Sequence, residues 1–255
     1  MAASTSNEED ARRAGSDEPA RTDGAADPHD PAYIFQSIFG SKMKGHWQTW
    51  PSIDLVELRS INPDCVGWIH MDGSPIDYPV VKQRFERSYT LTHNFSGEES
   101  VHGQVAMDFA LGGRMGERTT ILHAHHMKDW SMFKAIVSLD DPGYLAAHPV
   151  VELIHEGTRY TARWSAVLLY RSRDPWPERT SFADDADFEA WLARVMAENI
   201  VSTDVQIAAD AHLLVCCTCA FDQDPNDSFA AFAVIEGQAD VTNSLANDGA
   251  EWSER

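Results

Sequence analysis

Apolar residues recur at helical spacing in three segments of the chain. Two lie near the N-terminal end, over residues 32–39 and 53–61, and the third lies over residues 184–199. Asn62-Pro63-Asp64 ends the second segment, because a proline disfavours the helical conformation of the residue before it. Asp184 is a candidate N-cap for the third, since its carboxylate can accept a hydrogen bond from a free backbone N–H. The pattern therefore predicts three helices.

Elsewhere the pattern is that of short strands rich in β-branched and aromatic residues. The predicted strands are residues 66–70, 76–81, 104–108, 119–123, 150–154, 158–170, 212–219 and 229–236. One of them alternates clearly, and six of its residues are expected to share one face: Tyr160, Ala162, Trp164, Ala166, Leu168 and Tyr170. Many short strands with one late helix indicate a β-barrel or a β-sandwich with added helices.

The two ends of the chain differ from its middle. Residues 1–31 are dominated by acidic and small residues and contain no aromatic residue. Such a stretch buries too little apolar surface to offset the entropy lost on ordering. We expect a disordered acidic tail over 1–31, one folded domain over 32–238 and a loose polar tail over 239–255.

The charge balance excludes one class of partner. The chain has 255 residues, with 20 Lys and Arg against 40 Asp and Glu, for a net charge of −20. A surface this acidic repels phosphate backbones, so we expect no nucleic-acid binding. The longest strongly apolar run is about nine residues, Leu213 to Phe221, whereas a membrane helix needs roughly 20. No signal peptide is recognisable at the start either.

Two clusters of reactive side chains stand at the ends of predicted strands. One is His123-Ala124-His125-His126, and the other is Cys216-Cys217-Thr218-Cys219. A thiol needs a nearby base or cation to become a nucleophile, and histidine usually provides it. Two other interpretations stay open at this point. The cysteines are simple core residues, or His123, His125, Cys217 and Cys219 bind zinc, because residues two apart share a strand face.

The order of the motifs resembles that of one family, the class B sortases. Residues 61–69 (INPDCVGWI) resemble the family motif INPDVVGWI, and 76–81 (IDYPVV) resemble its IDYPVV strand. Residues 103–108 (GQVAMD), 120–127 (TILHAHHM) followed by 131–133 (SMF), and 214–219 (LVCCTC) stand where the family has GSIFMD, TIIYGHNM and LTLSTC. The resemblance runs from about residue 53 to 236, which is nearly the whole predicted domain.

This resemblance implies a fold and an activity. The fold is mainly β: a closed eight-stranded barrel with N-terminal helices and an extra helix before the cysteine-bearing strand. The activity is that of a thiol transpeptidase, with Cys219 as nucleophile and His125 as general acid and base. It cleaves a C-terminal sorting motif of a secreted protein and transfers the acyl part to an amine of a peptidoglycan precursor or a pilin. No metal and no cofactor are implied.

The sequence also departs from the family. The family has an arginine on the strand after the cysteine, whereas no Lys or Arg occurs here between Cys219 and Arg255. Arg87 is a candidate replacement, because its segment lines the substrate groove in the family. Leu91, Trp176 and Cys217 are the expected substrate-binding residues. The missing arginine leaves an alternative open, namely a catalytically impaired sortase fold that binds a sorting signal without turnover.

The resemblance and the N-terminal sequence point to different locations. The family acts at the extracytoplasmic face of the cell envelope, and we expect the same location from the resemblance. The acidic start, without a recognisable membrane helix or signal peptide, instead predicts a cytoplasmic protein if the chain begins at Met1.

Overall fold

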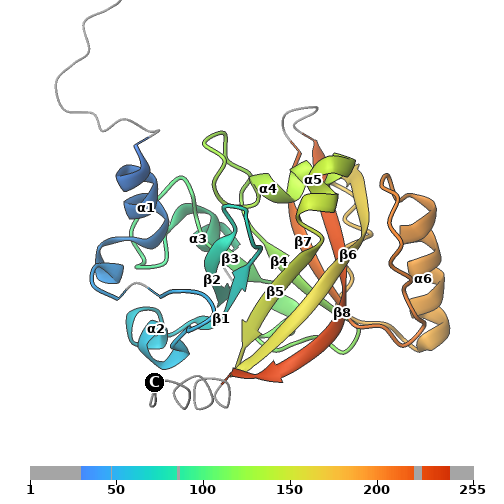
Figure 1. Cartoon of the computed structure of the whole chain (residues 1–255), viewed down its shortest axis with the longest axis horizontal. Helices are drawn as coiled ribbons and strands as arrows, with labels where there is room; N and C mark the ends of the chain where they lie inside the picture. The colour runs from blue at the N-terminus through green and yellow to red at the C-terminus, as the bar shows by residue number, and fades with distance from the viewer. Residues whose placement is uncertain (1–29, 47, 85–86, 221–225, 242–255) are drawn as a thin grey trace, which may run out of the picture.

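The barrel predicted from the family motifs is present in the computed structural model, which describes residues 30–46, 48–84, 87–220 and 226–241 (Figure 1). Its strands are β1 (Cys65–His70), β2 (Asp77–Lys82), β3 (Val105–Met107), β4 (Thr119–His123), β5 (Val150–His155), β6 (Thr158–Arg171), β7 (Leu213–Cys219) and β8 (Asp227–Asp240). They form one closed barrel in the order β1-β2-β3-β4-β7-β8-β6-β5. All eight strands predicted from the sequence are confirmed.

Six α-helices surround the described part of the barrel. They are α1 (Pro31–Phe39), α2 (Leu55–Ile61), α3 (Arg87–Thr92), α4 (Lys134–Val137), α5 (Pro142–Ala147) and α6 (Asp185–Ala197). The three predicted helices correspond to α1, α2 and α6, and Asp184 caps α6 by accepting a hydrogen bond from the Asp187 N–H. The sequence pattern missed α3, α4 and α5 because four to six residues are too few for helical periodicity to show.

The buried apolar residues of β4, β6, β7 and β8 divide between two clusters, whereas those of the other strands belong to one of them. One fills the barrel interior, and the other lies between the outer face of the barrel and α6, which stands beside the barrel wall in Figure 1. On β7, Leu214 and Cys216 point inward, whereas Val215 and Cys217 belong to the outer cluster. The interior cluster is the main core, and the outer cluster attaches α6 to the cysteine-bearing strand.

The prediction of one continuous face along β6 is wrong. Ala162 and Trp164 belong to the barrel interior, but Ala166, Leu168 and Tyr170 belong to the outer cluster under α6. The pairing of β6 with β8 shifts register between Trp164 and Ala166, which marks a bulge. One extra residue reverses the alternation beyond it, because strand side chains have a period of two.

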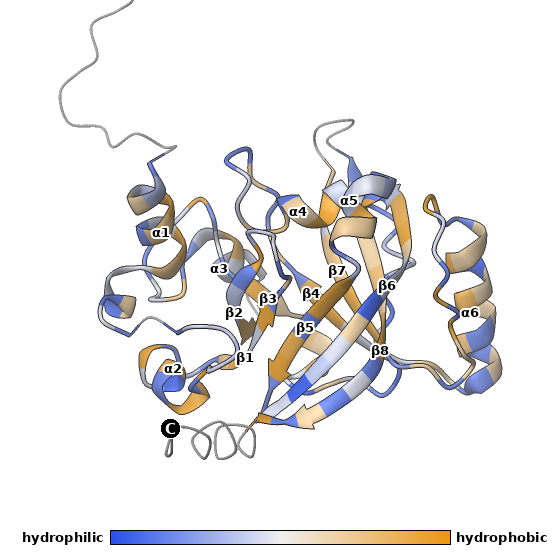
Figure 2. Ribbon diagram, viewed as in Figure 1, coloured by the Kyte–Doolittle hydropathy of each residue, from blue (hydrophilic) through white to orange (hydrophobic). Residues whose placement is uncertain are grey.

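Strand β8 is longer than the sequence indicates. It pairs with β6 as far as Asp240, two residues past the predicted end of the domain at 238. Its last residues are exposed and polar, so no hydrophobic alternation marks them in the sequence. Figure 2 shows this polar stretch where the start of β6 meets the end of β8. Within the described residues, no helix is long and apolar enough to cross a membrane.

Gly67 lies where β1 passes very close to β5. A Cβ atom at this position would stand 2.2 Å from the carbonyl oxygen of Ile154. We expect Gly67→Ala to lower the free energy of unfolding by about 2–3 kcal/mol, because the backbones must move apart. Gly237→Ala on β8 is the control, since a Cβ there meets no atom within 4 Å. Denaturant unfolding measures both, and an equal effect of the two changes would contradict the prediction.

Candidate active site

The two predicted catalytic residues follow neighbouring parallel strands. Strands β4 and β7 pair in parallel, with His123 opposite Cys217. His125 and Cys219 each lie two residues further on, so both stand at the same end of the two strands. They line one cavity of about 370 Å³. Its described lining is Gln83, Thr90, Leu91, His123, Ala124, His125, Tyr170, Ser172, Glu178, Cys217, Thr218, Cys219 and Ser228.

The ring of His125 is held by helix α3. Its Nε2 atom lies 2.9 Å from the carbonyl oxygen of Leu91. A carbonyl oxygen only accepts hydrogen bonds, so Nε2 carries the proton and Nδ1 holds the basic lone pair of the neutral ring. The backbone is fixed as well, because the Phe133 N–H donates to the His125 carbonyl at 2.8 Å. These contacts define the ring nitrogen that is available as a base.

His126 connects the loop after β4 to Cys219, the predicted nucleophile. Its Nδ1 donates to the carbonyl oxygen of Cys219 at 3.0 Å, and its Nε2 lies 3.1 Å from the Nζ atom of Lys134. The sequence placed His126 beside the predicted base but gave it no role. Only the fold reveals this contact, because it joins residues 93 positions apart.

Cys219 is the most accessible of the four thiols. Its side chain is partly exposed, whereas Cys65, Cys216 and Cys217 are buried. Burial raises the pKa of the Cys219 thiol above its usual value, and the nearby Glu178 carboxylate raises it further. Burial raises the pKa of Cys65 to about 12. The burial predicted for Cys65 and Cys216 is confirmed.

Four polar side chains to which the sequence analysis assigned no role in the site form another wall of the cavity. Tyr170 donates its hydroxyl hydrogen to Oε1 of Glu178, and the hydroxyl oxygens of Ser172 and Ser228 are 2.8 Å apart. Ser228 on β8 stands directly opposite Cys219 on β7. Burial raises the pKa of Tyr170, so its hydroxyl stays protonated. These residues are scattered along the sequence in ordinary strand and loop contexts, and no motif marks them.

Neither of two candidate donors for the oxyanion is seen free at the cavity: one is already hydrogen-bonded, and the other lies outside the described residues. The backbone N–H of Ala220, the residue after Cys219, donates a hydrogen bond to the carbonyl of Asp227 at 2.9 Å. Among the described residues that line the cavity, none is Lys or Arg. The side chain of Arg87 lies outside the described residues, so its role stays a prediction. Nearby Arg171 forms an ion pair with Asp227 at 2.8 Å.

The three predicted substrate-binding residues have different surroundings. Leu91 and Cys217 both line the cavity, Leu91 exposed and Cys217 buried. Trp176 packs instead against α6, where the Arg194 guanidinium lies 3.8 Å from the centre of its ring. The Trp176 carbonyl also accepts a hydrogen bond from Trp191 Nε1 at 3.3 Å. Trp176 thus anchors the loop between β6 and α6.

The alternative zinc site has no support in the described residues. There, no three His, Cys, Asp or Glu side chains are grouped so as to hold a metal ion. His123, one of the candidate ligands, instead bonds to Asp108 through Nε2 at 2.9 Å.

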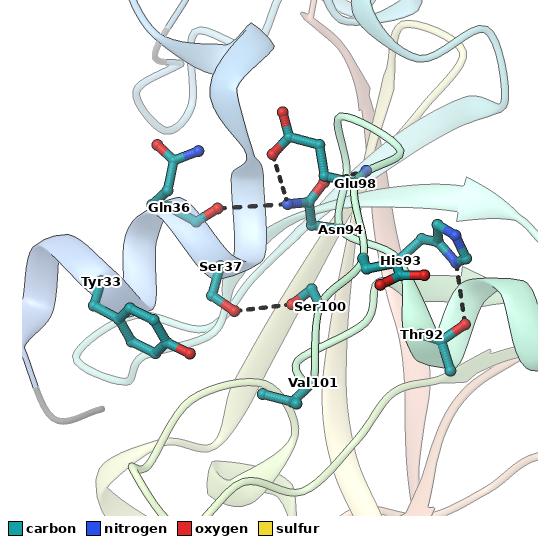
Figure 3. A pocket seen from close by; sticks show the side chains of 10 residues that line it. Tyr33, Gln36, Ser37, Thr92, His93, Asn94, Glu98, Ser100 and Val101 are labelled. Atoms are coloured by element: carbon teal, nitrogen blue, oxygen red, sulfur yellow. Dashed lines mark hydrogen bonds between the residues drawn. The ribbon is translucent and has the colours of Figure 1, made fainter. Parts of the chain in front are cut away.

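A larger cavity, of about 740 Å³, lies apart from these residues between α1 and the segment after α3 (Figure 3). Ser37 and Ser100 both line it and point toward each other, with hydroxyl oxygens 2.9 Å apart. Ser37 also bonds to Nδ1 of the buried His102 at 2.6 Å, and His102 Nε2 lies 2.7 Å from Asp129. This chain of contacts fastens α1 to the loop that follows His125 and His126.

We expect iodoacetamide to label Cys219 before the other three thiols. Its rate should rise with pH through the neutral range, because the thiolate reacts and the thiol pKa is raised. Glu178→Gln removes a nearby negative charge, so the rate at pH 7.5 should increase several-fold. Glu189→Gln, an exposed charge on α6, is the control. Peptide mapping by mass spectrometry measures the labelling, and preferential labelling of Cys65 or Cys216 would disprove the prediction.

Comparisons with known proteins agree with this fold. No protein-family model matches the chain. Sortase B of Listeria monocytogenes is 28% identical over 171 residues, which cover 67% of this chain and 69% of the relative. Sortase B of Staphylococcus aureus is 26% identical over 162 residues, which cover 64% of this chain and 66% of that relative. The alignments thus span about two thirds of each curated relative.

Solved structures extend the similarity to the fold. A Staphylococcus aureus sortase B–substrate complex matches with a TM-score of 0.64 and 25% identity, over 76% of this chain and 89% of that one. Clostridium perfringens sortase B matches with a TM-score of 0.66 and 25% identity, over 73% of this chain and 100% of that one. Together with the motif order and the closed barrel, these similarities to sortase B proteins support a class B sortase.

Proposed function

We propose that this chain is a cysteine transpeptidase that acts on sorting signals. One observation carries the proposal: Cys219 and His125 line one cavity at the same end of two adjacent parallel strands. In this reaction the Cys219 thiolate attacks the carbonyl carbon of the scissile peptide bond. The protonated His125 ring then donates its proton to the departing amine, and the acyl part stays on Cys219 as a thioester.

The second half of the reaction reverses these roles. An acceptor amine attacks the thioester, neutral His125 removes its proton, and the Cys219 thiolate leaves. The hydrogen bond that His125 Nε2 donates to the Leu91 carbonyl supports this exchange, because it leaves Nδ1 as the nitrogen that gains and loses the proton. We propose a secreted protein with a C-terminal sorting motif as the donor, and an amine of a peptidoglycan precursor or a pilin as the acceptor. The family relationship supports both, and with them a location at the cell envelope.

The cation that stabilises the oxyanion is the open part of this mechanism. Arg87 stays our candidate for that role, and Arg87→Ala should then slow acylation by about 10²-fold. The second candidate function is a sortase fold that binds a sorting signal without cleaving it. The absence of Lys and Arg from the described lining of the cavity favours that alternative.

Mass spectrometry of the intact protein distinguishes the two functions. The purified chain is incubated with a panel of sorting peptides without an acceptor amine. We expect a mass increase equal to the acyl fragment, which peptide mapping assigns to Cys219 and hydroxylamine removes. Saturable binding of a peptide with no adduct on Cys219 would instead establish the binding function.

A further inference from the structure

The loop between β6 and α6 holds one carboxylate firmly at the active-site cavity. The Glu178 N–H donates to the Pro175 carbonyl at 3.0 Å. The neighbours of Glu178 are attached to α6 on both sides, Trp176 through Arg194 and Trp191, and Arg179 through Asp187 at 2.6 Å. Glu178 is therefore presented by an ordered turn rather than by a free surface loop.

This carboxylate is the acidic group among the described side chains that line the cavity. Glu178 is half-buried and lines the same cavity as Cys219 and His125. The other described side chains of the lining are apolar, hydroxyl, amide, thiol or imidazole groups, and Tyr170 gives Glu178 a neutral hydrogen bond only. Within the part of the chain that the structure describes, no cation pairs with Glu178. A partly desolvated carboxylate of this kind attracts a positively charged ligand more strongly than an exposed one does.

Glu178 also opposes the reaction that the cavity performs. Its negative charge disfavours the Cys219 thiolate, and it disfavours the oxyanion that forms on the substrate carbonyl. A cation bound beside it would remove both effects. From residue 220 to residue 254 the sequence contains no Lys or Arg to provide that cation.

We infer that Glu178 is the binding site for a basic side chain of the substrate, so that the donor peptide carries a Lys or Arg beside its scissile bond. The inference rests on the proposed transpeptidase function and names the substrate class of that site. The ammonium or guanidinium group forms an ion pair with Glu178 on entering the cavity. The substrate thereby introduces a positive charge next to the thiolate and the developing oxyanion.

The test uses three matched hexapeptide pools. The pools differ at one fixed position, which is Lys in the first pool, its uncharged isostere norleucine in the second and Glu in the third. The other positions are randomised, and the experiment is repeated with the fixed position at each place along the peptide. Acylation of Cys219 is followed by mass spectrometry without an acceptor amine. Binding is measured separately on the Cys219→Ala protein. The variants are Glu178→Gln, which keeps an acceptor for Tyr170, Glu178→Lys, and the control Glu189→Gln on the exposed face of α6.

At one position we expect the Lys pool to acylate the full chain about 10- to 100-fold faster than the norleucine pool, the range expected for a hydrogen bond to a charged group. Glu178→Gln should reduce this ratio to near one, Glu178→Lys should transfer the preference to the Glu pool, and Glu189→Gln should preserve it. Equal acylation by Lys and norleucine pools would overturn the inference and leave the transpeptidase function intact.

Two further outcomes are also decisive. A Lys preference that appears only when an acceptor amine is added, and only in the transfer step, would overturn the inference and assign Glu178 to the acceptor. If no pool acylates Cys219, the transpeptidase function fails, and binding to the Cys219→Ala protein decides the inference alone. A Lys preference in binding that Glu178→Gln removes would support it, and equal binding of the Lys and norleucine pools would overturn it.

Discussion

Cys219→Ala is expected to abolish acyl-enzyme formation, with a fall in acylation rate of about 10⁴-fold or more. The reason is that no other described thiol can take its place: Cys65, Cys216 and Cys217 are buried and have raised pKa values. The control is Cys216→Ala, which removes a thiol three residues away that points into the barrel interior. Intact mass and denaturant unfolding are measured for both variants. Acylation that persists in folded Cys219→Ala would refute the assignment of the nucleophile.

His125→Ala should cause a loss of similar size, because the same ring both donates and removes the proton of the amine. His126→Ala provides the comparison within the same loop. His126 bonds to the Cys219 carbonyl, so its loss should misplace the nucleophile and lower the rate by a smaller factor. The pH–rate profile separates the two roles. Its shape should survive in His126→Ala but lose the limb that belongs to the general acid and base in His125→Ala.

The second large expected effect is an increase in the acylation rate. Ser228→Arg should raise the acylation rate by about 10²-fold, because a guanidinium at this position faces Cys219 across two paired strands and lines the same cavity. Phe229 and Ala231 follow on the same strand, but both lie in the barrel interior. An arginine at either one would be a buried unpaired charge and should unfold the protein rather than activate it.

Ser228→Gln is the matched control, since it adds a polar side chain at the same place without a charge. Initial acylation rates of Ser228→Arg, Ser228→Gln and the parent chain are compared on the same peptides, with unfolding measured in parallel. A folded Ser228→Arg protein with no gain over Ser228→Gln would mean that a missing cation does not limit the reaction. The binding function would then be favoured.

Most of the fold follows from local patterns in the sequence. Each strand carries enough alternating or continuous apolar residues to be recognised. Asp184 marks the start of α6, because an aspartate is a favoured N-cap residue. The failures also have local causes. Helices α3 to α5 are too short for periodicity, and the bulge near Trp164 reverses the faces of β6 without any change in composition.

Cys219 as nucleophile, His125 as base and the resemblance to class B sortases are all predictions from the sequence alone, because they depend on residue types in a fixed order along strands that have strong local signals. The surroundings of these residues depend on the tertiary structure. The parallel pairing of β4 with β7 brings His125 and Cys219 to one cavity, and antiparallel β8 brings Ser228 opposite Cys219. Tyr170 and Glu178 meet Cys219 there because a loop anchored on α6 returns to the barrel. No sequence motif encodes such contacts, since they depend on strand register and on side chains far apart in the chain, and they set the charge of the site.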